Sequence, residues 1–411
     1  MSRIRIAFIK YAGLSAGGTE KFLQTIAANL DKNKYDVTYF YCDATPYIGS
    51  DFSHPGTDVS REQYLLNSDV KLVKFSVIAK NVSDPYHPWV GTDFWDVFDE
   101  TKFDLIQTGR AGHPEFPFNH IRKTPIIDSI HLNAGVDNQQ NIAKVLLLGK
   151  WSLDQWVRNG GDRRRAAIVS HPTEPLRFDQ KIIPFDNERP IVFGFHQRVS
   201  NEIYSEIPIL AFSKISQKNV KFKIMGGGSN YQKQAKELGL SNIEFVSFSS
   251  ESADIEKFIA SLDVYAHGRK DGEINSTAIA EALRHGKPVL SHVSRINNGH
   301  IESIGDAGYV APSAVEYARA MEKFIENRLL IKEIGQKALT RFQENYELFS
   351  QMNKITNIYD EVFYNGYVKT SRLRAFLLKL RAKIRRLAKD YLTFTNFNPK
   401  YSPLNPDLSG P

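Results

Sequence analysis

One stretch, residues 265–290, constrains the fold of this chain more than any other. An apolar run at 262–266 predicts a buried strand, a polar loop with two glycines follows it, and apolar residues recur at helical spacing over 278–283. Asn275 or Ser276 can cap that helix, and a Gly-Lys-Pro sequence ends it before the next apolar run. We therefore expect a strand, a loop, a helix and a second strand, which is a unit of an α/β fold.

Two glutamates frame the start of this helix. The free N–H groups of a helix N-terminus and its dipole attract an anion such as a diphosphate. With Ser276 as the cap, Glu281 would lie roughly 7 Å further along the axis at ~1.5 Å per residue, about the distance from a diphosphate to its ribose hydroxyls. Glu273, in the loop, would face the group attached beyond the phosphates. We expect Asn275, Ser276 and Thr277 to contribute to donor binding with these two carboxylates.

The same residues resemble a known family. A glutamate, seven residues, Glu-Ala and then Gly-Lys-Pro-Val is similar to the donor-site motif of retaining GT-B glycosyltransferases, family 4 in particular (glycosyl transferases group 1). The resemblance implies that Glu281 holds the ribose and that Glu273 contacts the transferred sugar. The family usually has Gly-Phe-Gly after the first glutamate, whereas this chain has Ile274, Asn275 and Ser276, which leaves less room for backbone approach to phosphate.

Cations are expected around the diphosphate. In the family, a strand equivalent to 190–195 ends in a Gly-Arg segment with a lysine five residues later, and both cations hold the diphosphate. The resemblance assigns the first role, and a catalytic one, to Arg198, because a guanidinium pairs with phosphate bidentately. Ile203 occupies the lysine position. We expect Arg269 or Lys270 to supply the second charge instead.

Two glycine pairs follow expected strands. Gly17 and Gly18 belong to a Gly-Gly-x-Glu loop that resembles the loop opening family 4 enzymes, near donor phosphate and acceptor. Gly226 and Gly227 resemble the turn that lines the nucleotide pocket. The first loop is not the Gly-x-Gly-x-x-Gly fingerprint, so the sequence does not favour a dinucleotide-dependent dehydrogenase.

Histidines follow two further strands, expected at 103–107 and 125–130. His113 and His131 would thus lie at the carboxyl edge of a parallel sheet, where ligands bind. His131 also resembles the histidine that the family keeps beside the reacting sugar, and we expect it to be catalytic together with Glu273. A structural, hydrogen-bonding role is the alternative for both histidines.

Length and resemblance together predict the architecture. A chain of 411 residues favours two domains, and the expected fold class is α/β of the GT-B type, with two Rossmann-like domains facing each other across a cleft. We expect these segments: an acceptor domain at 1–170, a linker at 171–189, a nucleotide-sugar donor domain at 190–345, a cross-over helix at 346–366, a basic amphipathic helix at 369–392, and a disordered tail at 393–411.

The aromatic segment 80–100 has little periodicity. It predicts a loop with a short helix, which either covers an acceptor or packs the edge of the first domain. Cys42 is the one cysteine, which leaves no internal disulfide and favours a reducing compartment. With no apolar stretch of 18 residues and a first strand at 4–9, we expect a cytoplasmic protein.

Positive charge is concentrated near the C-terminus. The net charge is +7, and residues 369–390 hold nine Lys or Arg and one Asp, so the remainder is close to neutral. This counts against nucleic-acid binding by the folded body. Apolar residues between Leu373 and Tyr391 fall on one helical face with cations around it, a pattern typical of a helix on an anionic membrane surface. A nucleic-acid or protein partner, or packing on the body, are the alternatives.

The favoured function is a glycosyltransferase that moves a sugar from a nucleotide diphosphate sugar to a saccharide or lipid-linked acceptor in glycan or polysaccharide synthesis. The chain has no Asp-x-Asp motif and no cluster at metal-ligand spacing, so we expect neither a metal nor a cofactor besides the donor. The resemblance implies retention of anomeric configuration. Two rivals stay open: another GT-B enzyme such as a nucleotide-sugar epimerase or a phosphorylase, and an inert sugar-nucleotide-binding or membrane scaffold module.

Overall fold

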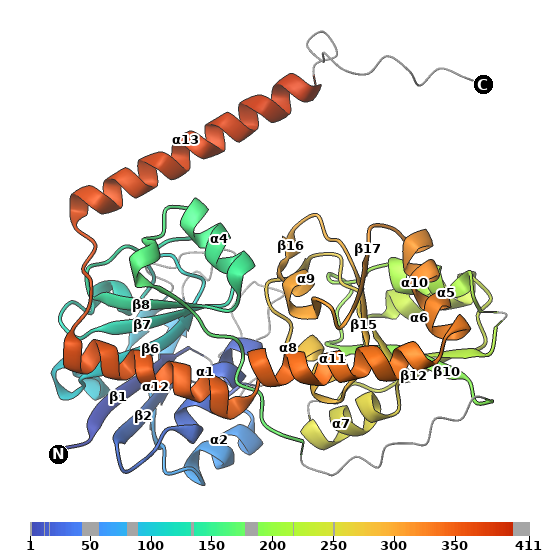
Figure 1. The fold of residues 1–411 in the computed structure, drawn as a ribbon. Helices are drawn as coiled ribbons and strands as arrows, with labels where there is room; N and C mark the ends of the chain where they lie inside the picture. The colour runs from blue at the N-terminus through green and yellow to red at the C-terminus, as the bar shows by residue number, and fades with distance from the viewer. Residues whose placement is uncertain are drawn as a thin grey trace.

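The computed structural model of the chain describes residues 2–11, 13–15, 17–42, 57–79, 89–132, 135–176, 188–216, 218–249 and 251–397. Two large parallel sheets dominate this part of the chain, one built from each half. They lie side by side in Figure 1, each with helices packed against it.

The first sheet has the strand order β3-β2-β1-β6-β7-β8-β9. Every adjacent pair is parallel. Its strands are β1 (Ile4–Lys10), β2 (Tyr35–Tyr41), β3 (Lys71–Lys74), β6 (Leu105–Arg110), β7 (Ile126–Ile130), β8 (Ile142–Leu147) and β9 (Ala166–Ile168). β6 and β7 are buried at every position, as expected for central strands covered on both faces.

Short helices and one hairpin complete the first domain. The helices are α1 (Gly18–Asn29), α2 (Val59–Leu66), α3 (Phe94–Val97) and α4 (Lys150–Arg158), with single 3-10 turns at Glu100–Lys102, Phe118–His120 and Arg163–Arg165. β4 (Val77–Ala79) pairs antiparallel with β5 (Trp89–Thr92). Phe94 and Phe98, from the aromatic segment, are buried and stack with one another in the core. Residues 80–88 of that segment lie outside the described residues.

The second sheet has the order β12-β11-β10-β13-β15-β17, again all parallel. Its strands are β10 (Ile191–Gln197), β11 (Val220–Gly226), β12 (Ile243–Val246), β13 (Val264–Ala266), β15 (Val289–His292) and β17 (Gly308–Ala311). A small parallel pair, β14 (Gly272–Glu273) with β16 (Asn297–Asn298), lies beyond its carboxyl edge. The helices are α5 (Ile207–Ser213), α6 (Ser229–Glu237), α7 (Ser252–Ala260), α8 (Thr277–Arg284), α9 (Gly299–Ile304), α10 (Ala314–Glu326) and α11 (Leu329–Asn345).

The chain then returns to the first domain through α12 (Leu348–Asn365). Met352, Ile355 and Val362 of this helix are buried in the core of the first sheet. The Tyr359 hydroxyl donates to the Gln107 side chain at 2.9 Å. Two doubly wound domains joined by a returning helix form the GT-B architecture expected from the sequence.

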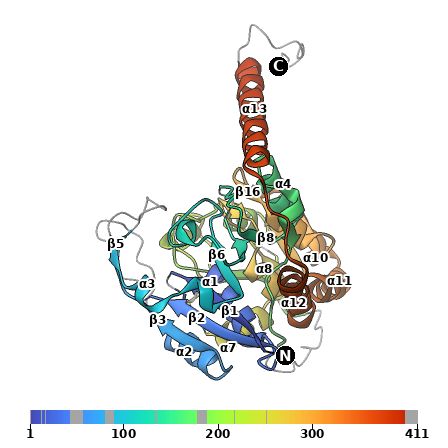
Figure 2. The ribbon, with the colours of Figure 1, turned by 90° about the vertical axis from the view of Figure 1, so that its left-hand side faces the viewer.

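The last helix, α13 (Arg372–Phe397), lies beside Gly160 of the first domain at Leu378 and then projects away from both domains (Figures 1 and 2). Thr370 and Arg374, near its start, hydrogen-bond the buried carboxylate of Asp162 in the first domain. The helix continues to Phe397, five residues into the predicted disordered tail, because no proline interrupts the chain before residue 399. None of the described helices is long and apolar enough to cross a membrane.

One edge strand escaped prediction. The three-residue β9 follows the charged turn Arg163–Arg165, and so short a segment has too little periodicity to be recognised. It pairs in parallel with β8 and completes one edge of the first sheet.

Candidate functional site

The N-terminus of α8 is capped by Ser276. Its hydroxyl accepts from the Ile279 N–H at 3.2 Å and donates to Oε1 of Glu273 at 3.0 Å. Of the two predicted caps, Ser276 is therefore the one used, and it also ties the loop carboxylate to the helix start.

Glu273 lies on β14 and is largely buried. His267 Nε2 lies 3.2 Å from its Oε1 and the Arg269 guanidinium lies 3.6 Å from the same oxygen. Burial acts to raise the pKa of Glu273, but the charge of Arg269 and the hydrogen bonds from His267 and Ser276 hold this pKa at about 2. Glu273 is therefore ionised at neutral pH.

His267 positions this carboxylate. Burial lowers its pKa to about 4, so the ring is neutral at pH 7. Because the ionised Glu273 carboxylate can only accept, the neutral ring carries its proton on Nε2, and Nδ1, 2.9 Å from the Ser291 hydroxyl, accepts from that hydroxyl. Sequence reasoning missed His267. Its one local signal is that it directly follows the strand β13.

A second histidine holds the second carboxylate. His196 Nε2 lies 3.0 Å from Oε2 of Glu281, and the Tyr265 hydroxyl lies 3.2 Å from His196 Nδ1. Burial acts to raise the pKa of Glu281, but the His196 hydrogen bond, with the charges of Lys21 and Arg284, lowers it to about 2. Sequence reasoning also passed over His196, the next-to-last residue of β10, which meets Glu281 because β10 and β13 are neighbours in the sheet.

Arg198 and the second glycine pair meet at the carboxyl end of β10. Arg198 is exposed directly after the strand, and the Gly227 N–H donates to the Gln197 carbonyl at 3.1 Å. Gly226 has a φ of +73°, and a Cβ there would lie 2.2 Å from that carbonyl oxygen. Glycine is thus required for the two turns to pack together.

Arg269 and Lys270, which were expected to replace the family's lysine, lie beside Ile203, the residue at that lysine position. The Lys270 N–H donates to the carbonyl of Ile203 at 3.2 Å. Lys270 is exposed, whereas the Arg269 guanidinium donates twice to Asp271, at 3.0 and 2.7 Å. Lys270 therefore presents its charge to solvent at this edge, and Arg269 is engaged with two carboxylates.

The first domain holds the remaining predicted site residues, Gly17, Gly18 and His131. Gly17 caps α1 beneath the Glu20 carboxylate, which is 3.3 Å from Lys10 Nζ, while a Cβ at Gly18 would meet open space. His131 follows β7, and its ring centroid lies 4.7 Å from that of Phe22.

The electrostatics of His131 favour the neutral ring. Burial lowers the pKa of His131 well below its usual range. Among the described residues its Nε2 is buried without a hydrogen-bond partner. His113, in contrast, packs against Gly135, and its Nδ1 lies 3.3 Å from the Pro114 carbonyl.

Asn275 faces the other domain. Its Nδ2 donates to the carbonyl of Leu148, at the end of β8, at 3.1 Å and to the Tyr346 hydroxyl at 3.4 Å. The sequence grouped Asn275 with the donor-binding residues, and the structure places its amide at the domain interface.

A cavity of ≈ 70 Å³ lies between α1 and α8. Thr277 and Glu281 line it from α8, and Lys21 and Thr25 line it from α1. Burial lowers the pKa of Lys21, against the attraction of Glu281. The cavity thus joins the carboxylate expected at the ribose to a cation from the first domain.

Residues 177–341 match the family model of the glycosyl transferases group 1. The second domain is therefore similar to the glycosyl transferases group 1 over these residues. This match covers α8 and both glutamates, and it agrees with the resemblance drawn from the loop and helix. No curated protein matches the sequence.

Solved structures match over both domains of this chain. HepE of Anabaena, in complex with UDP and glucose, aligns with a TM-score of 0.61 and 16% identity over 87% of this chain and all of that one. A glycosyltransferase from Rickettsia africae aligns with a TM-score of 0.66 and 14% identity over 89% of this chain and all of that one. Sucrose-phosphate synthase from Thermosynechococcus elongatus aligns with a TM-score of 0.64 and 14% identity over 88% of this chain and all of that one. The GT-B fold predicted from the sequence is confirmed.

Proposed function

We propose that this protein is a glycosyltransferase that transfers a sugar, with retention, from a nucleotide diphosphate sugar to a saccharide or lipid-linked acceptor, without a metal. One observation carries the proposal most. Two ionised carboxylates, Glu273 and Glu281, lie on either side of the Ser276-capped helix start, and each receives a hydrogen bond from a histidine. An inert nucleotide-binding module would need Glu281 but not an ionised carboxylate beside the transferred sugar, so Glu273 favours an enzyme.

Donor binding follows from the geometry of α8. The diphosphate would lie at the helix start near Thr277, and the ribose would lie along the helix at Glu281, in the cavity shared with Lys21. A carboxylate has about four lone-pair sites. Glu281 can therefore accept from His196 and from ribose hydroxyls at the same time.

Transfer breaks the bond between the anomeric carbon and the diphosphate oxygen, and the electron pair leaves with the diphosphate. The acceptor hydroxyl oxygen forms the new bond to that carbon, and its proton passes to the leaving phosphate oxygen. Arg198, Lys270 and the helix start would stabilise the leaving charge, a preorganised electrostatic contribution. Glu273, kept ionised by Arg269, would stabilise positive charge at the anomeric carbon, with His131 beside it from the first domain. Retention is proposed because the motif resembles a retaining family.

The structural neighbours suggest which substrates to try first. HepE was solved in complex with UDP-glucose, and another neighbour, at a TM-score of 0.60 and 14% identity, is the lipopolysaccharide outer core galactosyltransferase WaaB. We propose UDP-sugars as first donors and cell-surface glycan intermediates as acceptors.

We further propose that the protein works in the cytoplasm on the inner face of a membrane, through α13. The apolar residues Leu373, Phe376 and Ile384 of this helix are 68%, 61% and 56% exposed. Between residues 372 and 386 the helix also carries seven arginines and lysines, which suits a surface of anionic lipids.

Acceptor-dependent release of nucleoside diphosphate tests the proposal. Purified protein is incubated with each UDP-sugar, with and without an acceptor extract, in EDTA. UDP release that requires acceptor, with the anomeric configuration retained by NMR, is the expected result. Conversion of the UDP-sugar without acceptor would instead identify an epimerase, and no turnover with any donor despite nucleotide binding would identify an inert module.

A further inference from the structure

A carboxylate of the second domain caps a helix of the first. Oε1 of Glu302, on α9, accepts from the Lys150 N–H at 2.8 Å, and Oε2 accepts from the Trp151 N–H at 2.8 Å. These are the first two residues of α4. The residue at the N-cap position is Gly149, which has no side chain to accept from the helix start. The other domain supplies the missing acceptor.

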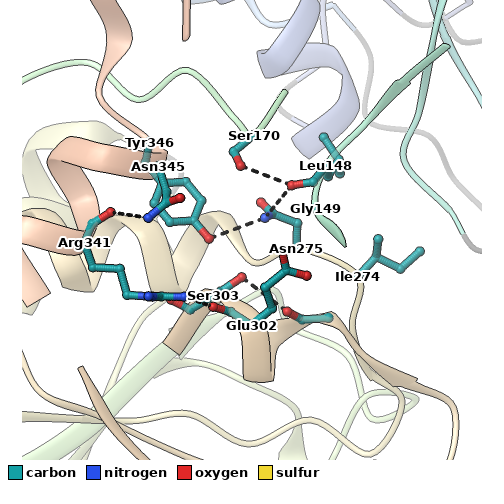
Figure 3. A pocket seen from close by; sticks show the side chains of 11 residues that line it. Leu148, Gly149, Ser170, Ile274, Asn275, Glu302, Ser303, Arg341, Asn345 and Tyr346 are labelled. Carbon is teal, nitrogen blue, oxygen red and sulfur yellow. Dashed lines mark hydrogen bonds between the residues drawn. The ribbon is translucent and has the colours of Figure 1, made fainter. Parts of the chain in front are cut away.

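A second contact between the domains comes from the donor loop itself. The Asn275 amide donates to the carbonyl of Leu148, which also accepts from the Ser170 hydroxyl at 3.1 Å (Figure 3). Leu148 immediately precedes the capped helix start. Asn275 lies between Glu273 and Ser276 in sequence, so this contact joins the loop that carries the reactive carboxylate to the first domain.

Both contacts are supported within the second domain. The Arg341 guanidinium, from α11, donates to the carbonyl of Ser303 at 2.7 Å and to the carbonyl of Glu302. The Tyr346 hydroxyl, from the end of α11, receives the other Asn275 bond at 3.4 Å. A cavity of ≈ 50 Å³ separates the two contacts, and Figure 3 shows Glu302, Asn275 and Arg341 arranged around it. α11 therefore fixes where α9 and the donor loop meet the first domain.

We propose that Glu302 and Asn275 act as an interdomain latch, a pair of positioning residues that hold the domains closed and fix the donor loop against the start of α4. The inference rests on the proposed transferase function. The hydrogen-bonding groups proposed for the ribose and diphosphate lie mainly in the second domain, whereas transfer requires the latch to be closed, because the acceptor side belongs to the first domain.

The chemistry of the latch suits a reversible device. A carboxylate at a helix N-terminus interacts favourably with the helix dipole and with unpaired N–H groups. Glu302 is exposed, so water can replace each hydrogen bond when the domains separate. The closed and open states of the two domains then differ by a small free energy, as a catalytic cycle with product release needs.

The test separates closure from nucleotide binding. Glu302→Ala should lower kcat about 10-fold, the effect of losing two hydrogen bonds of ordinary net strength, while the Kd for UDP in isothermal titration changes less than twofold. Small-angle X-ray scattering of the full chain should show a larger radius of gyration. Glu302→Gln, which keeps one acceptor oxygen, should recover part of both effects. Glu322→Ala is the matched control, because Glu322 pairs with Lys218 inside the second domain at 2.9 Å.

A second variant, on α4 of the first domain, breaks the same contact without altering α9. Lys150→Pro removes the N–H that Glu302 accepts and keeps α4, since proline is favoured at the first helical position and Gly149 is extended, with φ −174° and ψ 176°. Lys150→Ala loses the same side chain but keeps the N–H. Lys150→Pro should lower kcat about threefold, for one lost hydrogen bond, and expand the molecule, while Lys150→Ala should do neither.

Three results would overturn the latch. One is unchanged scattering and kcat in Glu302→Ala. Another is a UDP affinity that falls as much as kcat, which means a local structural role for Glu302. The third is equal behaviour of Lys150→Pro and Lys150→Ala. If the wild-type protein transfers no sugar, the proposed function fails, and the scattering of the same variants still decides whether the latch exists.

Discussion

His196 and Glu281 are 85 residues apart in the chain, yet His196 Nε2 lies 3.0 Å from the Glu281 carboxylate. The contact exists because β10 lies beside β13 in the sheet, and α8 follows from β13 through the loop. The proposed ribose carboxylate is therefore held by a hydrogen bond within the second domain. Nucleotide binding and sugar transfer can then respond separately to mutation.

The phosphate contacts give the first prediction. Arg198→Ala should cost about 2 to 4 kcal/mol in transition-state stabilisation, as loss of a charge-stabilising donor does. Arg198→Lys should recover part of this, because a lysine lacks the bidentate geometry. Steady-state kcat/KM for the UDP-sugar is the measurement. Near-normal activity in Arg198→Ala, with activity lost in Lys270→Ala, would move the phosphate contact to Lys270.

The hydrogen bond from His267 gives a pH prediction. Glu273 has a depressed pKa of about 2, so it is ionised throughout the neutral range. His267→Phe removes a donor and raises this pKa toward the usual value for glutamate, about 4.3. The acid limb of the kcat profile should therefore move to higher pH, with activity lost earlier as pH falls.

Two variants control this experiment. His267→Gln keeps an N–H donor and should shift the acid limb less. Ser291→Ala removes the partner of His267 Nδ1 without touching Glu273, and its shift should also be smaller. An acid limb at the same pH in all three variants and the wild type would contradict the role given to His267.

The C-terminal helix gives the next prediction. Thr370 and Arg374 bond the buried Asp162, so truncation after Arg374 keeps these contacts and should leave a folded protein that binds UDP. It should lose flotation with vesicles that contain anionic lipid, and full-length flotation should weaken with salt. Activity on a soluble acceptor should persist, while activity on a lipid-embedded acceptor should fall.

A point variant tests the same helix without truncation. Phe376→Asp places a charge on the exposed apolar face, and it should reduce flotation while the circular dichroism spectrum is unchanged. Equal flotation of the wild-type, truncated and Phe376→Asp proteins would show that α13 does not bind the membrane.

The sequence predicts local units of this fold well. The spacing around α8, its serine cap and the positions of both glutamates can all be read from adjacent residues, as can the successive strands of each domain. The partners of those glutamates cannot. His196 reaches Glu281 only through the strand order, and His267 gives no sign in sequence that its ring turns toward Glu273.

Contacts between the domains are harder to predict from the sequence. Gly149 at a helix start indicates a missing cap, but nothing in the sequence shows that Glu302, about 150 residues away, supplies it. Asn275 fits a cap position as well as an interface position, and the local pattern cannot distinguish them. Asp162 likewise shows no sign of binding Arg374, because that contact depends on where α12 returns the chain.

The central claim is that Glu281 binds the nucleotide and Glu273 acts on the sugar. Glu281→Ala and Glu273→Ala are compared by isothermal titration with UDP and by initial rates of acceptor-dependent UDP release. We expect the Glu281 variant to bind UDP about 10-fold to 100-fold more weakly, for lost hydrogen bonds to a charged group. The Glu273 variant should bind UDP with nearly wild-type affinity and turn over far more slowly. Unchanged UDP affinity in Glu281→Ala, or wild-type turnover in Glu273→Ala, would contradict the account.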